Sequence, residues 1–390
     1  MAAPFANYQN EIYLTGTTGQ RPPFTTDLSR LEDAAREVLD PQAFGYVAGS
    51  AGSTSTARAN RAAFERWRIV PRLLRAVSQR DQSTTVLGAT MPAPVLLAPV
   101  GVQTIVHPDG ELASARAAAA LGLVFIHSTA AAHSIEQVAE ASGDGQRWYQ
   151  LYWPNERAVA ASFVGRAEAA GYTALVVTLD TFVIGWRPTD LDTAYLPFLQ
   201  GVGIANYLTD PAFTAPLGPD AQDFDKVFRW AGIFGNPSLT WDDLAWLREQ
   251  TALPIVLKGI LHPDDARAAV DAGVDGIVVS NHGGRQVDGA IASLDALPAV
   301  ADVVQRRIPV LLDSGVRGGA DVFKAVALGA TAVLLGRPYV YGLAIAGERG
   351  VREVLRNVRA EFDLTMGLAG CRSVAEITRE NLEAGVPSNE

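Results

Sequence analysis

Short apolar runs alternate with longer segments of helical periodicity from about residue 91 onward. The runs are rich in Val, Ile and Leu and only a few residues long, as expected for strands that are buried on both faces of a parallel sheet. The candidate strands are residues 94–100, 124–128, 148–152, 174–180, 255–258, 276–280, 310–313 and 332–336. Helical patterns lie between them, for example over residues 110–121, 156–170, 263–272 and 320–328.

This alternation indicates how the sheet is built. Strands that alternate with helices predict parallel pairing, and eight such units in a chain of this size predict a closed (β/α)₈ TIM barrel. An open doubly wound sheet is the alternative, but no Gly-x-Gly-x-x-Gly motif follows the first candidate strand. We therefore predict an α/β fold of the TIM-barrel type.

Two segments depart from the repeating pattern. Residues 1–90 are predicted to form a cap, with one amphipathic helix over residues 28–39. Residues 181–239 form a long insertion after the fourth strand, and we predict a lid because its aromatic residues, which include Trp186, Tyr195, Phe198 and Tyr207, can pack. The expected organisation is a cap (1–90), a barrel (91–370) that carries the lid insertion (181–239), and a C-terminal tail (371–390).

Composition and charge narrow the classes of partner. The formal net charge of -10 argues against a nucleic-acid partner, so an anionic ligand must be held by local arginines. The single cysteine, Cys371, excludes a disulfide within the chain and fits a reducing compartment. Residues 1–5 show no leader pattern, and no apolar run is long enough to span a membrane. We therefore expect a cytoplasmic protein without a membrane partner, and the histidine spacing predicts no metal site.

Polar residues end most of the predicted strands, at the edge where barrel active sites form. The most informative motif, Ser280-Asn281-His282-Gly283-Gly284-Arg285-Gln286, follows the sixth strand. Histidine titrates near neutral pH, and arginine can bind a carboxylate through two parallel hydrogen bonds. His282 and Arg285 on one glycine-rich loop therefore suit chemistry on a small organic acid. The other polar strand ends are Ser128, Gln150, Tyr152, Thr178, Asp180, Lys258, Asp313, Gly336 and Arg337.

Each of these residues also has a purely structural interpretation. Asp180 could cap a loop, Arg187 could form an ion pair within the insertion, and Lys258 could be a solvated strand end. The glycine-rich stretches at residues 315–319 and 336–338 follow strands seven and eight, where exposed backbone amides and a helix start form the usual phosphate site of a barrel. The combination of these features favours one functional site at the strand ends over separate structural roles for each residue.

The same residues resemble the FMN-dependent 2-hydroxy-acid oxidase and dehydrogenase family. The resemblance extends from Phe44-Gly45-Tyr46 to Gly336-Arg337-Pro338, and the motif at residues 280–286 is highly specific. Within the family, the chain is most similar to the lactate 2-monooxygenase group. The supporting segments are residues 10–13, 98–101, 184–188 and 206–211.

The resemblance implies roles in catalysis and substrate binding. His282 would be the active-site base, and Asp180 would orient it and stabilise its cation. Arg187 and Arg285 would bind the substrate carboxylate. Tyr46 and Tyr152 would also donate hydrogen bonds to the carboxylate and the hydroxyl of the substrate.

The resemblance also implies FMN as the cofactor. Lys258 would lie near N1 and O2 of the flavin and favour the anionic reduced ring. The residues expected around the rest of FMN are Ser128, Gln150 and Thr178 at the ring edge, Pro99, Val100 and Gly101 near N5, Asp313 at the ribityl chain, and Gly315, Arg317, Gly336 and Arg337 at the phosphate.

The expected reaction is oxidation of L-lactate, or another small L-2-hydroxy acid, with O₂. A monooxygenase keeps pyruvate bound and gives acetate, CO₂ and water. The long aromatic insertion favours this outcome because it should slow product release. Gly101 favours it too, because its missing side chain could leave space over the flavin. The alternative is an oxidase that releases pyruvate and hydrogen peroxide.

Remoter alternatives stay open. A quinone-linked dehydrogenase would need a basic insertion for membrane docking. A redox-silent barrel would bind only a phosphate-bearing ligand. The sequence does not decide whether the base takes a proton from the α-carbon or from the hydroxyl, and the resemblance implies a homo-tetramer or homo-octamer. The quinone-linked alternative is disfavoured because the insertion is acidic and not basic. It carries Asp190, Asp192, Asp210, Asp220, Asp223 and Asp225.

Overall fold

The computed structural model describes residues 7–22 and 24–385. The beginning of the predicted cap lies outside the described residues. This includes residues 1–5, for which no leader pattern was expected. The same holds for residues 386–390 of the predicted tail.

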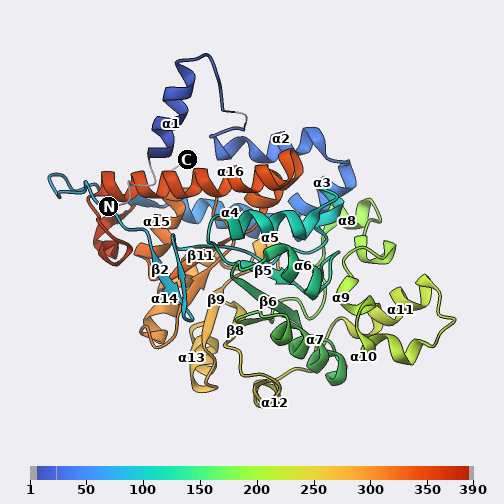
Figure 1. Cartoon of the computed structure of the whole chain (residues 1–390). Coiled ribbons are helices and arrows are strands. Elements are labelled where there is room, and N and C mark those ends of the chain that lie inside the picture. The colour runs from blue at the N-terminus through green and yellow to red at the C-terminus, as the bar shows by residue number, and fades with distance from the viewer. Residues whose placement is uncertain (1–6, 23, 386–390) are drawn as a thin grey trace.

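Eight parallel strands close into a barrel, as predicted (Figure 1). They are β4 (Val95–Leu97), β5 (Phe125–Ser128), β6 (Arg147–Tyr152), β7 (Leu175–Thr178), β8 (Ile255–Ile260), β9 (Gly276–Val279), β10 (Val310–Leu312) and β11 (Ala332–Leu335). β11 pairs with β4 and closes the sheet. The predicted strands were therefore correct in number and place, with ends that differ by a few residues.

The apolar runs are explained by burial on both sides of the barrel. Alternate residues point inward, and they form a separate core that includes Leu96, Ile126, Trp148 and Val176. The residues between them face the surrounding helices, so both sets are apolar. A hairpin of β2 (Thr84–Val86) and β3 (Ala89–Met91) adds Val86 and Met91 to the inner core.

Helices surround the barrel (Figure 1). They are α5 (Gly110–Ala120), α6 (Ile135–Ser142), α7 (Arg157–Ala169), α12 (Asp243–Gln250), α13 (Pro263–Asp271), α14 (Ser293–Val304), α15 (Gly319–Ala327) and α16 (Arg337–Ala369). The four helical patterns named from the sequence correspond to α5, α7, α13 and α15, with bounds within one residue. Across the described residues, no helix combines the length and the apolar character needed to cross a bilayer.

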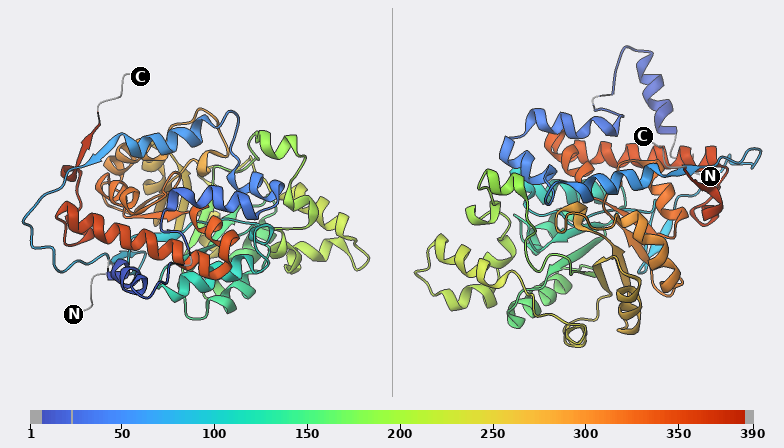
Figure 2. Two further views of the ribbon diagram at one scale, coloured as in Figure 1. Left: turned by 90° about the horizontal axis from the view of Figure 1, so that it is seen from above. Right: turned by 180° about the vertical axis from the view of Figure 1, so that it is seen from behind.

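The N-terminal part supplies one wall of the barrel mouth. Its helices are α1 (Asn7–Gly16), α2 (Leu31–Val38), α3 (Pro41–Ala48) and α4 (Ser55–Glu65). The single helix predicted over residues 28–39 is a 3₁₀ turn (Leu28–Arg30) followed by α2. The strand β1 (Trp67–Ile69) pairs antiparallel with β12 (Leu382–Ala384), which ties the end of this part to the C-terminal tail. The helix α1 projects from the body in Figure 1 and in the right view of Figure 2.

The insertion after β7 is largely helical. It contains α8 (Pro188–Asp192), α9 (Ala205–Leu208), α10 (Pro211–Thr214), α11 (Asp223–Ile233) and two 3₁₀ turns (Pro197–Gln200 and Ala215–Leu217). Phe198 and Tyr207 are buried as expected, but Trp186 is 73% exposed, so the expectation that it packs was wrong. The helix α8 lies against α3 (Figure 1), and the α11 region extends to the side (Figure 2).

Candidate active site

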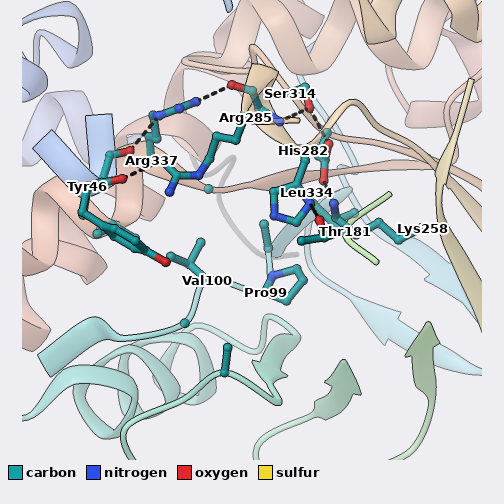
Figure 3. Close-up of a pocket in the computed structure, with 18 of the residues that line it drawn as sticks. Tyr46, Pro99, Val100, Thr181, Lys258, His282, Arg285, Ser314, Leu334 and Arg337 are labelled. Atoms are coloured by element: carbon teal, nitrogen blue, oxygen red, sulfur yellow. Dashed lines mark hydrogen bonds and ion pairs between the residues drawn. The ribbon is translucent and has the colours of Figure 1, made fainter. Parts of the chain in front are cut away.

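A pocket opens at the carboxyl ends of the barrel strands. In Figure 3, Tyr46 lies across the pocket from His282 and Lys258, with Pro99 and Val100 between them. The predicted site residues that line the pocket are Tyr46, Pro99, Val100, Gly101, Tyr152, Arg187, Lys258, His282, Arg285, Asp313, Gly315, Arg317, Gly336 and Arg337. Four predicted residues are not among its lining residues, namely Ser128, Gln150, Thr178 and Asp180.

The loop that carries His282 has an unusual backbone. His282, Gly283 and Gly284 all have positive φ, at 58°, 67° and 76°. A side chain on Gly284 would come within 2.7 Å of the backbone nitrogen of Ala57 in α4. The two glycines of the motif are therefore needed to turn the chain and to let it pass close to the N-terminal part.

A buried pair of amides supports this loop. Asn281 and Asn60 exchange two side-chain hydrogen bonds of 2.8 and 2.7 Å, and Asn281 also accepts a hydrogen bond from the backbone of Gly284. Asn60 could not be identified from the sequence, because its partner is more than 200 residues away and no local pattern marks it. The amide pair joins α4 to the motif and fixes the position of His282.

Asp180 and Thr181 hold the imidazole. His282 Nδ1 lies 2.7 Å from Asp180 Oδ1 and 2.9 Å from Thr181 Oγ1, and Thr181 donates to the same carboxylate oxygen. The carboxylate therefore favours the tautomer with its proton on Nδ1, which leaves Nε2 as an acceptor. Nε2 lies 3.4 Å from the hydroxyl of Tyr152. Thr181 lines the pocket, although sequence reasoning did not single it out.

Burial and charge set the protonation of this pair. Burial lowers the pKa of His282, although the charge of Asp180 opposes the shift, so the imidazole is neutral at pH 7. Burial alone would raise the pKa of Asp180, but the positive charge of Lys258 and the contact with His282 outweigh it and keep that pKa well below its usual range. The pair is therefore a neutral base beside an anion, which is the arrangement that favours proton uptake at Nε2.

Lys258 provides a fixed positive charge at the end of β8. Its side chain is 4% exposed, and its Nζ lies 3.3 Å from Asp313 and 3.8 Å from Asp180. It donates a hydrogen bond to Ser280 Oγ at 2.9 Å. Burial would lower the pKa of this ammonium, but the two carboxylates raise it above its usual value, so the charge is kept.

Two arginines reach the pocket beside His282. Arg285 Nη1 donates to the carbonyl oxygens of Tyr46 and Gly49, at 2.5 and 2.8 Å, and its guanidinium lies over the Tyr46 ring. Arg187 donates from Nε to the carbonyl of Arg285 and from Nη2 to Gln286 Oε1, at 3.0 and 2.8 Å. These hydrogen bonds fix the orientation of both guanidinium planes and use only some of the N–H groups of each arginine. Burial, with a contribution from the charge of Arg285, lowers the pKa of Arg187 to about 10, so it stays charged at neutral pH.

The opposite end of the pocket contains the glycine-rich segments after β10 and β11. Gly315, Arg317 and Gly336 line it, and the partial burial of Arg317 lowers its pKa. A helix start was expected to bind phosphate here. At the start of α15, the backbone N–H of Gly319 already donates a hydrogen bond to Glu361 at 2.7 Å. The loop at residues 315–317 and the start of α16 are the segments that could still bind a phosphate.

Arg337, at the start of α16, is a tether to the N-terminal part. Its guanidinium donates to the carbonyls of Val47, Gly49 and Gly283, at 2.8–3.0 Å. Figure 3 labels Arg337 and marks hydrogen bonds from its guanidinium with dashed lines. Its predicted phosphate contact stays a prediction.

The strand ends behind the pocket fit a flavin ring. Ser128 Oγ donates to Gln150 Oε1 at 2.7 Å. Gln150 Nε2 and Thr178 Oγ1 are buried, and neither has a hydrogen-bond partner within the described part of the chain. Buried polar groups are rarely left unpaired unless a ligand completes them, and the ring edge of FMN offers both donors and acceptors. These orphaned groups therefore fit FMN.

One feature attributed to the pocket was misjudged from the sequence. A side chain on Gly101 would overlap the carbonyl oxygen of Ala130, so this glycine is required by a close backbone approach. The idea that its missing side chain simply opens space over the flavin was therefore wrong in its reason. Trp186 does not line the pocket, whereas its neighbour Ile184 does.

A family model described as FMN-dependent dehydrogenase matches residues 35–384. The chain belongs to this family. It therefore uses FMN, as predicted, and it belongs with the FMN-dependent 2-hydroxy-acid oxidases and dehydrogenases.

Relatives in the family cover nearly the whole chain. The FMN-dependent alpha-hydroxy acid dehydrogenase qulF of Penicillium citrinum is 46% identical over 382 residues, which are 96% of this chain and 95% of that protein. An L-lactate oxidase of Lysinibacillus sphaericus (strain C3-41) is 45% identical over 367 residues, covering 93% of this chain and 94% of the relative. A crystal structure of mandelate oxidase superposes with a TM-score of 0.82 at 40% identity, and covers 93% of this chain and 100% of that one.

Proposed function

We propose that this FMN-dependent enzyme oxidises L-lactate, or another small L-2-hydroxy acid, with O₂, and that it acts as a lactate 2-monooxygenase. The observation that carries the proposal is the position of His282. It is held by Asp180 on one side and reaches a pocket that Arg187 and Arg285 also line. The two guanidinium groups match the carboxylate of such an acid, and the base beside them matches its α-hydroxyl.

The arginines would set the orientation of the substrate. Their remaining N–H groups can take a carboxylate in bidentate fashion, which places the α-carbon at a defined distance from the base. Tyr46 holds Arg285 through its carbonyl, and its hydroxyl is directed into the pocket (Figure 3). Tyr46 would therefore add a hydrogen bond to the same carboxylate.

His282 would then take the proton. Its neutral Nε2 is the available acceptor, and the cation that forms is stabilised by Asp180 at 2.7 Å. Tyr152, 3.4 Å from Nε2, would hold the substrate hydroxyl beside this nitrogen. The pKa of Tyr152 is raised by burial, so its hydroxyl keeps its proton and acts as a donor.

Bound FMN supplies the redox chemistry, because it accepts two electrons from the substrate and passes them to oxygen. Lys258 would hold its positive charge against the electron-rich ring. The residues that would hold the rest of FMN are Ser128, Gln150, Thr178, Pro99, Val100, Gly101, Asp313, Gly315, Arg317, Gly336 and Arg337.

The insertion is what favours a monooxygenase over an oxidase. Phe198 and Phe234 from residues 181–239 line the pocket, and Trp230 stacks on Phe198 with 4.8 Å between ring centres. A packed aromatic cover slows the escape of pyruvate, which gives oxygen chemistry time to decarboxylate it. The second candidate is an L-lactate oxidase, and the relatives that bear this name favour it.

Product analysis separates the two candidates. With L-lactate and O₂, the proposal predicts about one acetate and one CO₂ per O₂ consumed, with little hydrogen peroxide or free pyruvate. Acetate, pyruvate and peroxide would be measured in the same reaction, with and without catalase, since free peroxide can decarboxylate pyruvate in solution. Equal amounts of pyruvate and peroxide in the presence of a rapid peroxide trap would assign the oxidase instead.

A further inference from the structure

Asp190 is a buried carboxylate with an unusual environment. It lies on α8 of the insertion and is 9% exposed. Neither of its oxygens has a hydrogen-bond partner within residues 7–22 and 24–385. The closest ion pair is with Arg187, whose Nη1 lies 4.0 Å from Asp190 Oδ2. A charge that is buried without hydrogen bonds is costly, so it calls for an explanation.

The electrostatics connect Asp190 to the arginine pair. Burial raises the pKa of Asp190, while the charges of Arg285 and then Arg187 oppose that rise and favour the anion. Asp190 therefore acts on both arginines that line the pocket, although it does not line the pocket itself. The helix α8 is held in place against α3, where Gly45 leaves room for Thr189.

We propose that Asp190 is a specificity-determining residue that limits the pocket to one negative charge. This inference rests on the proposed binding of a substrate carboxylate by Arg187 and Arg285. The two arginines and Asp190 together carry one net positive charge, which a single carboxylate balances. A substrate with a second carboxylate would place that extra charge in a site where Asp190 already repels it.

The expected consequence is a preference for monocarboxylates that depends on charge. Replacing Asp190 with the nearly isosteric asparagine removes the repulsion and changes the shape very little. We expect about tenfold tighter binding of a monoanion, which corresponds to about 1.4 kcal/mol of relieved repulsion, and a larger gain for a dianion. The cost of the change would be slower product release.

The test uses the oxidised holoenzyme and two unreactive probes with three-carbon skeletons. Pyruvate carries one charge and malonate carries two, and each is titrated while the flavin absorbance is followed. The variants are Asp190→Asn and Asp190→Ala. The matched control is Asp192→Asn, which makes the same charge change on an exposed residue of the same helix. FMN content and melting temperature are measured for every variant.

The proposal predicts that both Asp190 variants lower the Kd of malonate by a larger factor than that of pyruvate, while Asp192→Asn changes neither. Unchanged Kd values, or equal changes for both probes, would overturn it. Loss of the fold in both variants would also overturn it, because Asp190 would then be a structural residue. If the unaltered enzyme bound no pyruvate at all, the proposed function itself would fail, and this result is distinct from the others.

Discussion

Replacing His282 with alanine is expected to slow the reduction of bound FMN by L-lactate by a factor of about 10³–10⁴, the upper part of the range for a lost general base. The loss should appear in the reduction rate, because Arg187, Arg285 and Tyr46 keep the carboxylate site. The measurement is anaerobic stopped-flow absorbance of the flavin. FMN content should stay near that of the unaltered enzyme, since none of the residues expected at the phosphate is altered.

The control for this variant is His262→Ala. His262 is an exposed histidine that caps α13 through the backbone of Asp264, at the carboxyl side of the same barrel. Its loss should affect helix stability slightly and leave flavin reduction unchanged. If His282→Ala reduced its flavin as fast as His262→Ala, another group would be the base.

The protonation of His282 gives this prediction a pH dependence. The neutral form is the active one, and burial lowers its pKa from the ordinary value near 6.5. The reduction rate of the unaltered enzyme should therefore rise with pH, through a pKa below 6.5, to a plateau at neutral pH. A rate that fell with rising pH in that range would contradict the assignment.

Replacing Arg285 with methionine is expected to raise the Kd of pyruvate and the KM for L-lactate by a factor of about 10²–10³. Methionine has a similar length but neither charge nor donors, and the loss of one buried charged partner costs about 2–5 kcal/mol. Arg285→Lys should recover only part of the loss, because lysine cannot offer two parallel hydrogen bonds. Titration with pyruvate and steady-state kinetics check both variants.

Arg285 also holds the N-terminal part through the carbonyls of Tyr46 and Gly49. Melting temperature and FMN content therefore accompany the kinetics. The control is Arg267→Met, at an arginine of α13 whose side chain is 54% exposed. A variant at Arg285 that keeps its fold and FMN but shows an unchanged KM would exclude this residue from carboxylate binding.

The barrel was predictable because its signal is local. Each strand is a short apolar run buried on two faces, and most of them end on a polar residue or are followed directly by one. The motif around His282 was equally visible, since its glycines, histidine and arginine stand within a few positions. Its chemistry could therefore be proposed from the amino-acid sequence alone.

The parts that sequence reasoning missed depend on contacts between distant segments. Asn60 meets Asn281 only after α4 has packed on the barrel. Trp186 faces solvent because the backbone of Gly185 is pressed against Gln286 and the side chain of Arg187 turns inward. Hydrophobicity alone would bury the tryptophan, and only the position of its two neighbours shows why it is exposed.

Gly101 illustrates the same limit. Glycine in a sequence indicates either free space or a close approach, and the two have opposite meanings for a pocket. The carbonyl of Ala130 stands where a side chain of residue 101 would be, so the close approach is the correct explanation. The case for a monooxygenase consequently rests on the insertion and on product residence.

The most direct test of the central claim is a single anaerobic mixing of the FMN-bound enzyme with L-lactate. The account predicts rapid loss of the visible absorbance of oxidised flavin and formation of one pyruvate per FMN. An enzyme that binds FMN fully, yet keeps its flavin oxidised with L-lactate and other small L-2-hydroxy acids, would contradict it.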